Sequence, residues 1–179
     1  MKNKILYFTL FTAVLLTFQQ KVNAQDIFIA ARMNDTVALT QLLKNHVKTD
    51  TVDHRGSTPL IIAVYNENEA ATLLLLKNGA DPNAKDLSGN TALMGACYKG
   101  FLPMVKFLYE HKANLNQQNY NSATALIFAA TFGHEEIVKY LISNGALKNT
   151  KDRFGKTALD YALNQENEHM IALLKENNL

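Results

Sequence analysis

The chain has few of the residues and motifs that carry covalent or phosphate chemistry. Cys97 is the only cysteine, so no disulfide can form within the chain and the fold must be held together by packing. Neither G-x-x-x-x-G-K-S/T nor G-x-G-x-x-G occurs, and these are the glycine-rich patterns whose backbone N–H groups cradle phosphates. The sequence therefore offers no nucleotide-binding fingerprint.

Metal-binding and nucleophilic patterns are missing as well. The five histidines are far apart in sequence and no two have the i, i+4 spacing of a zinc-binding helix. His134-Glu135-Glu136 lacks the second His of H-E-x-x-H and matches an ordinary helix start. Cys97 stands at a small apolar position, where a buried residue is favoured over a nucleophile. We predict no catalytic residues, no cofactor and no metal site. The histidines are His46, His54, His111, His134 and His169.

The apolar run near the start of the chain is too short to span a membrane. Ile5 to Phe18 comprises 14 residues, whereas a spanning helix needs roughly 20. Lys2 and Lys4 precede the run, and a polar stretch with small residues at the cleavage positions follows it up to Ala24. This is the layout of a secretory signal peptide. We predict a signal peptide over residues 1–24 that is cleaved after Ala24, with a membrane anchor as the alternative.

A cleaved leader implies an exported protein, periplasmic in a Gram-negative host and secreted otherwise, with no stable membrane anchor after cleavage. Removing the leader takes away three lysines and no acid, so the formal charge changes from +2 to −1 for residues 25–179. A chain so close to neutral gives no electrostatic reason to expect nucleic acid as a partner. We expect a monomer.

What the chain does have is a period of 33 residues. The period aligns a Thr, a Leu and an Ala in four successive segments, and a turn-forming Asp or Asn precedes each of them. Several residue types on one period indicate stacked repeats. The aligned sets are Thr58, Thr91, Thr124 and Thr157; Leu60, Leu93, Leu126 and Leu159; Ala63, Ala96, Ala129 and Ala162; and Asp53, Asp86, Asn119 and Asp152.

The segments GSTPLIIAV, GNTALMGAC, SATALIFAA and GKTALDYAL resemble the G-x-T-P-L-H-x-A-A signature of ankyrin repeats. GHEEIVKYLISNGA, residues 133–146, resembles the second-helix half of the same repeat. The family has the same period, and the resemblance covers essentially all of residues 25–179. It implies an all-α ankyrin repeat solenoid of helix-turn-helix units with short β-hairpin-like loops, and it says little about function.

The residues within each unit agree with this architecture. Thr58 can cap a first helix that begins at Pro59, and the second helix is expected from Glu69 to Lys77, with Gly79 after its end. In the best-marked unit, Gly145 ends the second helix. We place a degenerate first unit at 26–52, full units at 53–85, 86–118 and 119–151, and a terminal unit at 152–179, all within one ankyrin repeat domain over residues 25–179.

Three departures from the family pattern lead to further expectations. Ile61, Met94, Ile127 and Asp160 replace the His of T-P-L-H, which supports hydrogen bonds between loops in that family, so the resemblance does not extend to that network. His46 and Lys112 stand where a Gly would end the second helix. If they adopt the left-handed conformation, each costs roughly 1 kcal/mol. Ser122 replaces the turn Gly, which predicts an altered hairpin tip in the unit 119–151.

In ankyrin stacks, partners bind the concave surface formed by the hairpin tips and the exposed side of each first helix, and the resemblance places these positions here. Three aromatic residues and an Arg occur in a register where exposure alone would favour small polar residues, and such side chains are enriched at interfaces. Alternatively, the aromatics close gaps in the stack. The first-helix positions are Arg32 and Met33, Tyr65 and Asn66, Tyr98 and Lys99, Thr131 and Phe132, and Asn164 and Gln165. The tip positions are Arg55, Tyr120, Arg153 and Phe154, with His54, Leu87, Ser88 and Asn121 beside them.

The sequence thus favours a non-enzymatic protein–protein interaction module that is exported and binds a protein partner through its concave face and hairpin tips. The alternative is an enzyme or small-ligand protein with a site in the concave groove. A deep pocket with converging polar groups would favour that alternative, and a shallow continuous groove would favour protein binding.

Overall fold

The computed structural model describes residues 26–175, and the predicted signal peptide over residues 1–24 lies outside this part of the chain. Every regular element within it is an α-helix, so the predicted all-α fold is confirmed. No helix within these residues is long and apolar enough to cross a membrane. A helix over residues 26–32 is followed by α2 (Thr36–Lys44), α3 (Pro59–Tyr65), α4 (Glu69–Lys77), α5 (Ala92–Lys99), α6 (Leu102–Glu110), α7 (Ala125–Thr131), α8 (Glu135–Ser143), α9 (Ala158–Asn164) and α10 (Glu168–Lys175).

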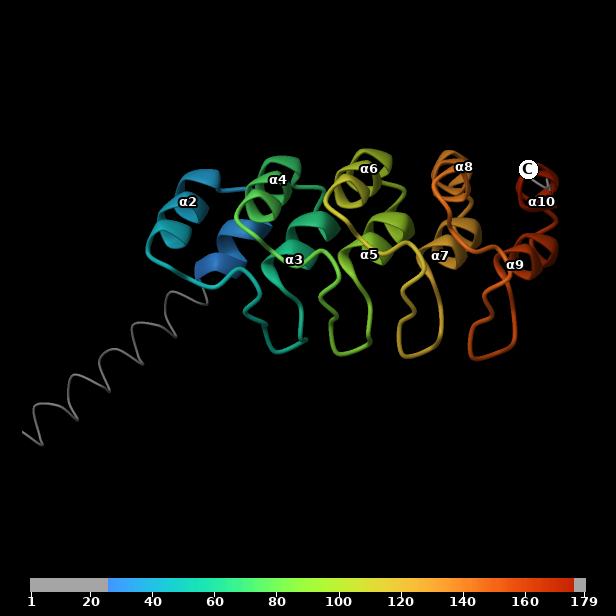
Figure 1. Cartoon of the computed structure of the whole chain (residues 1–179), viewed down its shortest axis with the longest axis horizontal. Helices are drawn as coiled ribbons and strands as arrows, with labels where there is room; N and C mark the ends of the chain where they lie inside the picture. The colour runs from blue at the N-terminus through green and yellow to red at the C-terminus, as the bar shows by residue number, and fades with distance from the viewer. Residues whose placement is uncertain (1–25, 176–179) are drawn as a thin grey trace, which may run out of the picture.

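The helices form two rows (Figure 1). Residues 26–32, α3, α5, α7 and α9 make the row of first helices, and α2, α4, α6, α8 and α10 make the row of second helices. Long hairpin loops project from the side of the first helices, all in the same direction, as Figure 1 shows. The result is an elongated stack in which successive units lie side by side.

The first helices α3, α5, α7 and α9 start in the same way. The side chains of Thr58, Thr91 and Thr124 accept the N–H of the residue three positions later, at 3.3–3.4 Å. Each bond satisfies one of the helix donors that has no partner within the helix. At Thr157 the partner Asp160 also accepts from the cap, which completes a capping box. The predicted Thr caps are confirmed.

Residues with positive φ mark three places in each unit. Within residues 26–175 all of them fall into three registers of the 33-residue period. The first register joins the two helices of a unit, the second follows the second helix, and the third lies at the hairpin tip. These registers are Asn34, Glu67, Gly100, Gly133 and Glu166; His46, Gly79, Lys112 and Gly145; and Gly56, Gly89, Ser122 and Gly155.

The residues that replace glycine at these positions can be compared with what the sequence predicted for them. His46 and Lys112 have φ of 61° and 70°, so they adopt the left-handed conformation of the glycines they replace, and the cost of roughly 1 kcal/mol for each applies. The expectation of an altered tip at Ser122 is wrong. Ser122 has a φ of 58° and donates its N–H to Asn119 O at 2.9 Å, as Gly89 does to Asp86 O. The tip keeps its shape because a short polar side chain tolerates the left-handed region at a cost of about 1 kcal/mol.

The core is a continuous layer between the two rows of helices. Ala63, Ala96, Ala129 and Ala162 are completely buried, and each first helix packs against the first helices of the neighbouring units. A side chain of one methyl group lets the helix backbones approach closely. The Leu at the start of each first helix is buried in α3, α5 and α7 and only partly buried in α9, because α9 belongs to the last described unit.

Polar side chains connect neighbouring units in the place of the missing His. In the loops after the second helices, Asp50, Asn83 and Asn116 each accept a backbone N–H from the next unit, at 2.7–2.9 Å. The hairpin tips add backbone bonds between units, in which Leu87, Tyr120 and Arg153 donate their N–H to carbonyls of the preceding tip at 2.8–3.1 Å. Loop-to-loop hydrogen bonding is therefore present and runs through Asp, Asn and backbone groups.

A third connection lies where the first helix turns into the second. The His134 Nε2–H donates to Tyr98 O of the preceding unit at 3.2 Å, and Asn68 and Gln165 bond to the preceding unit in a similar way. The His134 ring lies against Gly100, where an added Cβ would be 2.6 Å from the ring. Gly133 is in the same register one unit later, and an added Cβ there would meet nothing within 4 Å.

This pair of glycines separates steric contact from backbone strain. Gly100→Ala should lower the free energy of unfolding by about 2–4 kcal/mol, because left-handed strain adds to displacement of the His134 ring and loss of its hydrogen bond. Gly133→Ala should cost only the strain, about 1 kcal/mol. Urea unfolding of both variants measures the difference. Equal losses would show that His134 moves aside without cost, and in a His134→Ala background the two variants should become alike.

Candidate functional site

Three aromatic side chains from successive units touch one another at the ends of α3, α5 and α7. The rings of Tyr65 and Tyr98 are stacked with centroids 6.2 Å apart, and Tyr98 meets Phe132 edge to face at 4.5 Å. Nonetheless they are 48%, 39% and 47% exposed. We call Tyr65, Tyr98 and Phe132 the ladder. The ladder packs against itself and presents about half of its surface to solvent.

The ladder carries a cation beside its rings. The Lys99 ammonium lies 5.1 Å from the centroid of Tyr65 and 5.7 Å from that of Phe101, a geometry in which the ring quadrupole attracts the charge. Lys99 therefore lies on the aromatic surface. A partner at the ladder would meet a positive charge together with the rings.

The other predicted first-helix side chains differ in their exposure and in whether their polar groups are already hydrogen-bonded. Arg32, Met33 and Asn164 are exposed. Thr131 is partly buried and donates its hydroxyl to Ile127 O at 2.7 Å. The side-chain amides of the two remaining positions donate to backbone carbonyls, Asn66 within its own helix at 2.8 Å and Gln165 to Thr131 O at 2.7 Å. The predicted register thus mixes surface side chains with side chains that hold the scaffold.

The hairpin tips form a second surface. We call residues 51–57, 84–90, 117–123 and 150–156 the hairpin row; its loops are the ones that project together in Figure 1. In each loop the side chain of the leading Asp or Asn accepts the N–H groups two and four residues later, at 2.8–3.0 Å. These bonds hold the tips in one shape without a β-strand.

Apolar side chains on successive tips are largely exposed. Leu87, Tyr120 and Phe154 are 66–71% exposed, although Leu87 lies against Gly56 and Tyr120 against Gly89. At these glycines an added Cβ would lie within 3 Å of the next tip, so the absence of a side chain lets neighbouring tips touch. The predicted tip residues are therefore brought into one continuous row.

The last tip contains the shortest hydrogen bond of the hairpin row. Asp152 accepts the Tyr161 hydroxyl at 2.5 Å as well as two backbone N–H groups. Burial pushes the pKa of this carboxyl upward, but the hydrogen bonds from Tyr161, Lys156 and Phe154 outweigh it, so the pKa is lowered. The pKa of Tyr161 is raised, first of all by its bond to Asp152. Neither residue was among the candidate binding positions, because a spacing of nine residues gives no sequence signal.

The positions of the cysteine and of the potential metal ligands bear on whether the chain could carry chemistry. Cys97 is completely buried, and burial raises the pKa of its thiol far above the ordinary value. A thiol that stays protonated and inaccessible cannot attack a substrate. Within residues 26–175 no group of three or more His, Cys, Asp or Glu residues is placed to hold a metal ion.

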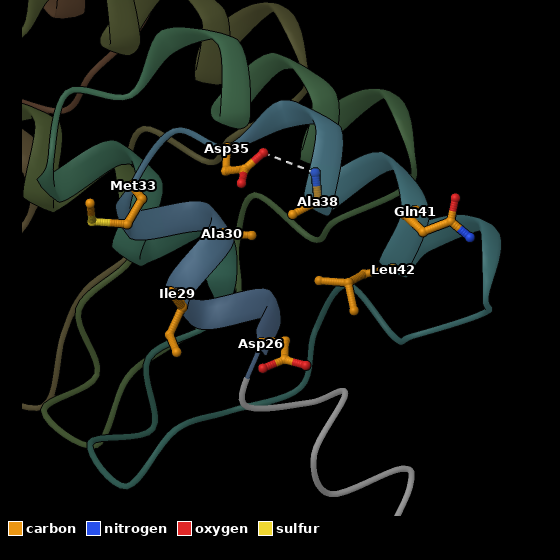
Figure 2. A pocket seen from close by; sticks show the side chains of 8 residues that line it. All are labelled: Asp26, Ile29, Ala30, Met33, Asp35, Ala38, Gln41 and Leu42. Atoms are coloured by element: carbon orange, nitrogen blue, oxygen red, sulfur yellow. Dashed lines mark hydrogen bonds between the residues drawn. The ribbon is translucent and has the colours of Figure 1, made fainter.

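Two hollows are lined by residues that belong to neither the ladder nor the hairpin row. One, of about 530 Å³, lies on the first described unit and is lined by Ile29, Met33 and Leu42 among others (Figure 2). Figure 2 shows its lining coming from the helix over residues 26–32 and from α2, with the Asp35 cap beside it. A second, of about 310 Å³, lies by Gly100 and His134. Neither brings together polar groups from the ladder and the tips.

Comparison with known proteins adds one finding. A family model described as ankyrin repeats (3 copies) matches residues 27–119, 73–152 and 93–179. These matches together extend over the region in which the 33-residue period was found. A search of curated proteins gave no match.

The contribution of the Asp152 charge can be tested by replacing Asp152 with Asn. Asn119, at the equivalent position of the preceding unit, holds the same turn with an amide. Asp152→Asn should keep the tip and lower the free energy of unfolding by about 1 kcal/mol at pH 7, because the Tyr161 bond loses its charge. A lowered folded-state pKa means that ionised Asp152 stabilises the fold above the unfolded pKa of about 3.9, and that this contribution disappears as the pH falls through the folded value.

The difference between wild type and Asp152→Asn in urea unfolding should therefore shrink as the pH falls below about 4. Asp160 also has a lowered pKa, but it is present in both proteins and cancels in the difference. A difference that stays constant over this range would mean that the carboxylate charge does not stabilise the tip.

Proposed function

The chain belongs to the ankyrin repeat family, and from this premise we propose that it is a non-enzymatic module that binds a protein partner along the ladder and the hairpin row. Ankyrin repeats are generally protein–protein interaction modules, and ankyrin repeat proteins are typically non-enzymatic. The proposal goes further because it names the surface. The observation that carries it is the ladder, three touching aromatic side chains in one register that remain about half exposed.

Contiguous exposed apolar side chains mark an interaction surface, whereas scattered ones are ordinary. Aromatic side chains bury large areas and contribute strongly when they enter an interface. Tyr65, Tyr98 and Phe132 lie in successive units, so a partner that covers one can cover all three without bending around the stack. The exposed Leu87, Tyr120 and Phe154 supply a second row of apolar side chains along the tips.

The scaffold supports binding by a pre-formed surface. Each hairpin tip is held by its own Asp or Asn, and each tip after the first also has a backbone bond to the preceding tip. A surface fixed in this way loses little conformational freedom when a partner docks, so more of the contact energy appears as affinity. The mechanism we propose is rigid shape complementarity.

A small-ligand or enzymatic site in the concave groove is the other function that the sequence left open. Such a site needs a deep pocket with a few converging polar groups. The hollows described above lie at the end of the stack and beside His134, and the buried Cys97 thiol offers no nucleophile. Binding of a protein over a broad surface fits the arrangement better.

We also propose that the protein is exported. The support is the layout of residues 1–24, with two lysines, a 14-residue apolar run and a polar segment that ends in Ala24. The destination would be the periplasm in a Gram-negative host and the medium otherwise, where the chain would act as a monomer on a protein of the same compartment.

Processing of the leader is directly measurable. N-terminal sequencing of the protein recovered from its own host should begin at Gln25, and fractionation should place it in the periplasmic extract or the medium. A chain that keeps Met1 and sediments with membranes would contradict export by cleavage and would support the membrane anchor.

The ladder is tested by a triple variant, Tyr65→Ala, Tyr98→Ala and Phe132→Ala. A tagged wild-type protein is first used to isolate a stoichiometric partner. The variant should bind that partner at least about tenfold more weakly, because interface aromatics commonly contribute 2 kcal/mol or more each. Its melting temperature should stay within about 5 °C of wild type, since the three rings are already half exposed.

A matched control removes exposed apolar side chains elsewhere, as Val37→Ala, Leu147→Ala and Leu163→Ala, all of them 46–79% exposed. This control should bind the partner as wild type does. A ladder variant that melts far below wild type would show that the rings hold the stack together, and a control that loses affinity equally would remove the ladder's special role.

A further inference from the structure

The hairpin row has more positive than negative side chains. It contains three carboxylates, Asp53, Asp86 and Asp152, and each of them accepts N–H groups of its own turn. These carboxylates are thus committed to holding the loops. The five cations of the hairpin row are Arg55, Lys85, Lys151, Arg153 and Lys156.

This charge is local and does not reflect the whole chain. Residues 26–175 contain as many Asp and Glu as Lys and Arg, so those of them that lie outside the hairpin row have a formal excess of negative charge. A molecule with one basic edge and an acidic remainder orients an oppositely charged partner towards that edge during encounter.

The cations of the hairpin row are interleaved with aromatic rings. Arg153 lies 4.6 Å from the centroid of Phe154, and Lys85 lies 5.6 Å from that of Tyr120. Lys85 also donates to Gln118 O at 2.8 Å, and Arg153 donates to Asn121 Oδ1 at 3.0 Å. The charged groups of Lys85 and Arg153 are therefore each held in place beside an exposed ring.

Such a row fits a protein segment better than a nucleic acid. Binding to nucleic acid without sequence preference needs free ring faces on which bases can stack, and here cations lie over the rings while Tyr120 also lies on Gly89. An acidic polypeptide needs only carboxylates at the cations and apolar side chains at the exposed ring edges.

Resting on the proposed protein-binding function, we propose that the partner docks on the hairpin row through an acidic segment with interspersed apolar or aromatic residues. Its carboxylates pair with Arg55, Lys85 and Arg153, and its apolar side chains contact Leu87, Tyr120 and Phe154. The ladder then contacts the part of the partner next to this segment.

A copolymer of glutamate and tyrosine is a suitable probe for this chemistry. The protein should bind it in calorimetry at about 50 mM NaCl and lose about fivefold or more in affinity at about 300 mM, where exposed charges are screened. Arg55→Gln, Lys85→Gln and Arg153→Gln together should weaken binding at low salt about tenfold. The matched control, Lys44→Gln, Lys77→Gln and Lys106→Gln on the second helices, removes the same charge and should stay within about twofold of wild type.

A single substitution tests the proposal even if the triple variant fails to fold. The Arg55 side chain makes no hydrogen bond or ion pair within residues 26–175, so Arg55→Gln should melt as wild type does and still bind the copolymer about threefold more weakly. Absence of binding to the copolymer at low salt overturns the proposal. Equal losses in the hairpin and control variants do the same, and so does tighter binding of a single-stranded oligonucleotide of similar charge.

The isolated partner separates this proposal from the function on which it rests. If the ladder variant releases the partner and the hairpin variant keeps it, protein binding stands and the acidic segment is wrong. If both variants release it, both proposals are supported. If neither releases it, the partner binds elsewhere, so protein binding stands while the ladder and the acidic segment are both wrong.

Discussion

The structure depends on the fact that none of its helices is long enough to stand alone. The helices α2 to α10 have seven to nine residues, and isolated helices of that length are marginal in water. Each is stable only because its apolar face is covered by its own unit and by the neighbouring units. Ala63 and its counterparts are completely buried for this reason. Local sequence sets where each helix begins and ends, and stacking determines that it exists.

Between the helices, the backbone is fixed at three left-handed positions in each unit, and polar groups join each unit to the next. Asn83 bonds forward to Asn114, His134 bonds backward to Tyr98, and Leu87 bonds backward to Arg55. These bonds lie in the loop after the second helix, at the junction of the helices and at the hairpin tip. With three separate connections, a unit has little freedom to rotate against its neighbour, so the ladder and the hairpin row keep their spacing.

Much of this could be predicted from the sequence because the repeats contain the same signals for the start and the end of a helix. Thr58 with Pro59 marks a helix start, and Gly79 marks a helix end, whatever surrounds them. What escaped prediction depends on contacts between units. The family His is absent, yet Asp50, Asn83 and Asn116 connect the loops. Ser122 keeps the tip it was expected to alter, because its backbone bond to Asn119 fixes the turn.

The candidate site shows the same division. The period placed Tyr65, Tyr98 and Phe132 in one register, but it could not show that their rings touch while remaining half exposed. It also gave no sign that the polar groups of Asn66, Thr131 and Gln165 form hydrogen bonds to backbone carbonyls of the scaffold. Nor could it pair Asp152 with Tyr161. Side-chain direction and contact across units are set by packing, which one-dimensional spacing does not contain.

The three left-handed registers have a consequence for how such a chain can change in length. A duplication or deletion of one whole period keeps the helix caps, the turns and the backbone bonds between hairpin tips in register, so the stack can grow or shrink by complete units. An insertion of a single residue inside a helix moves the buried alanines off their face and shifts every later register against its neighbour. The 33-residue spacing between Gly100 and Gly133 is therefore fixed by geometry, and a change in unit number disturbs the stack less than a change in unit length.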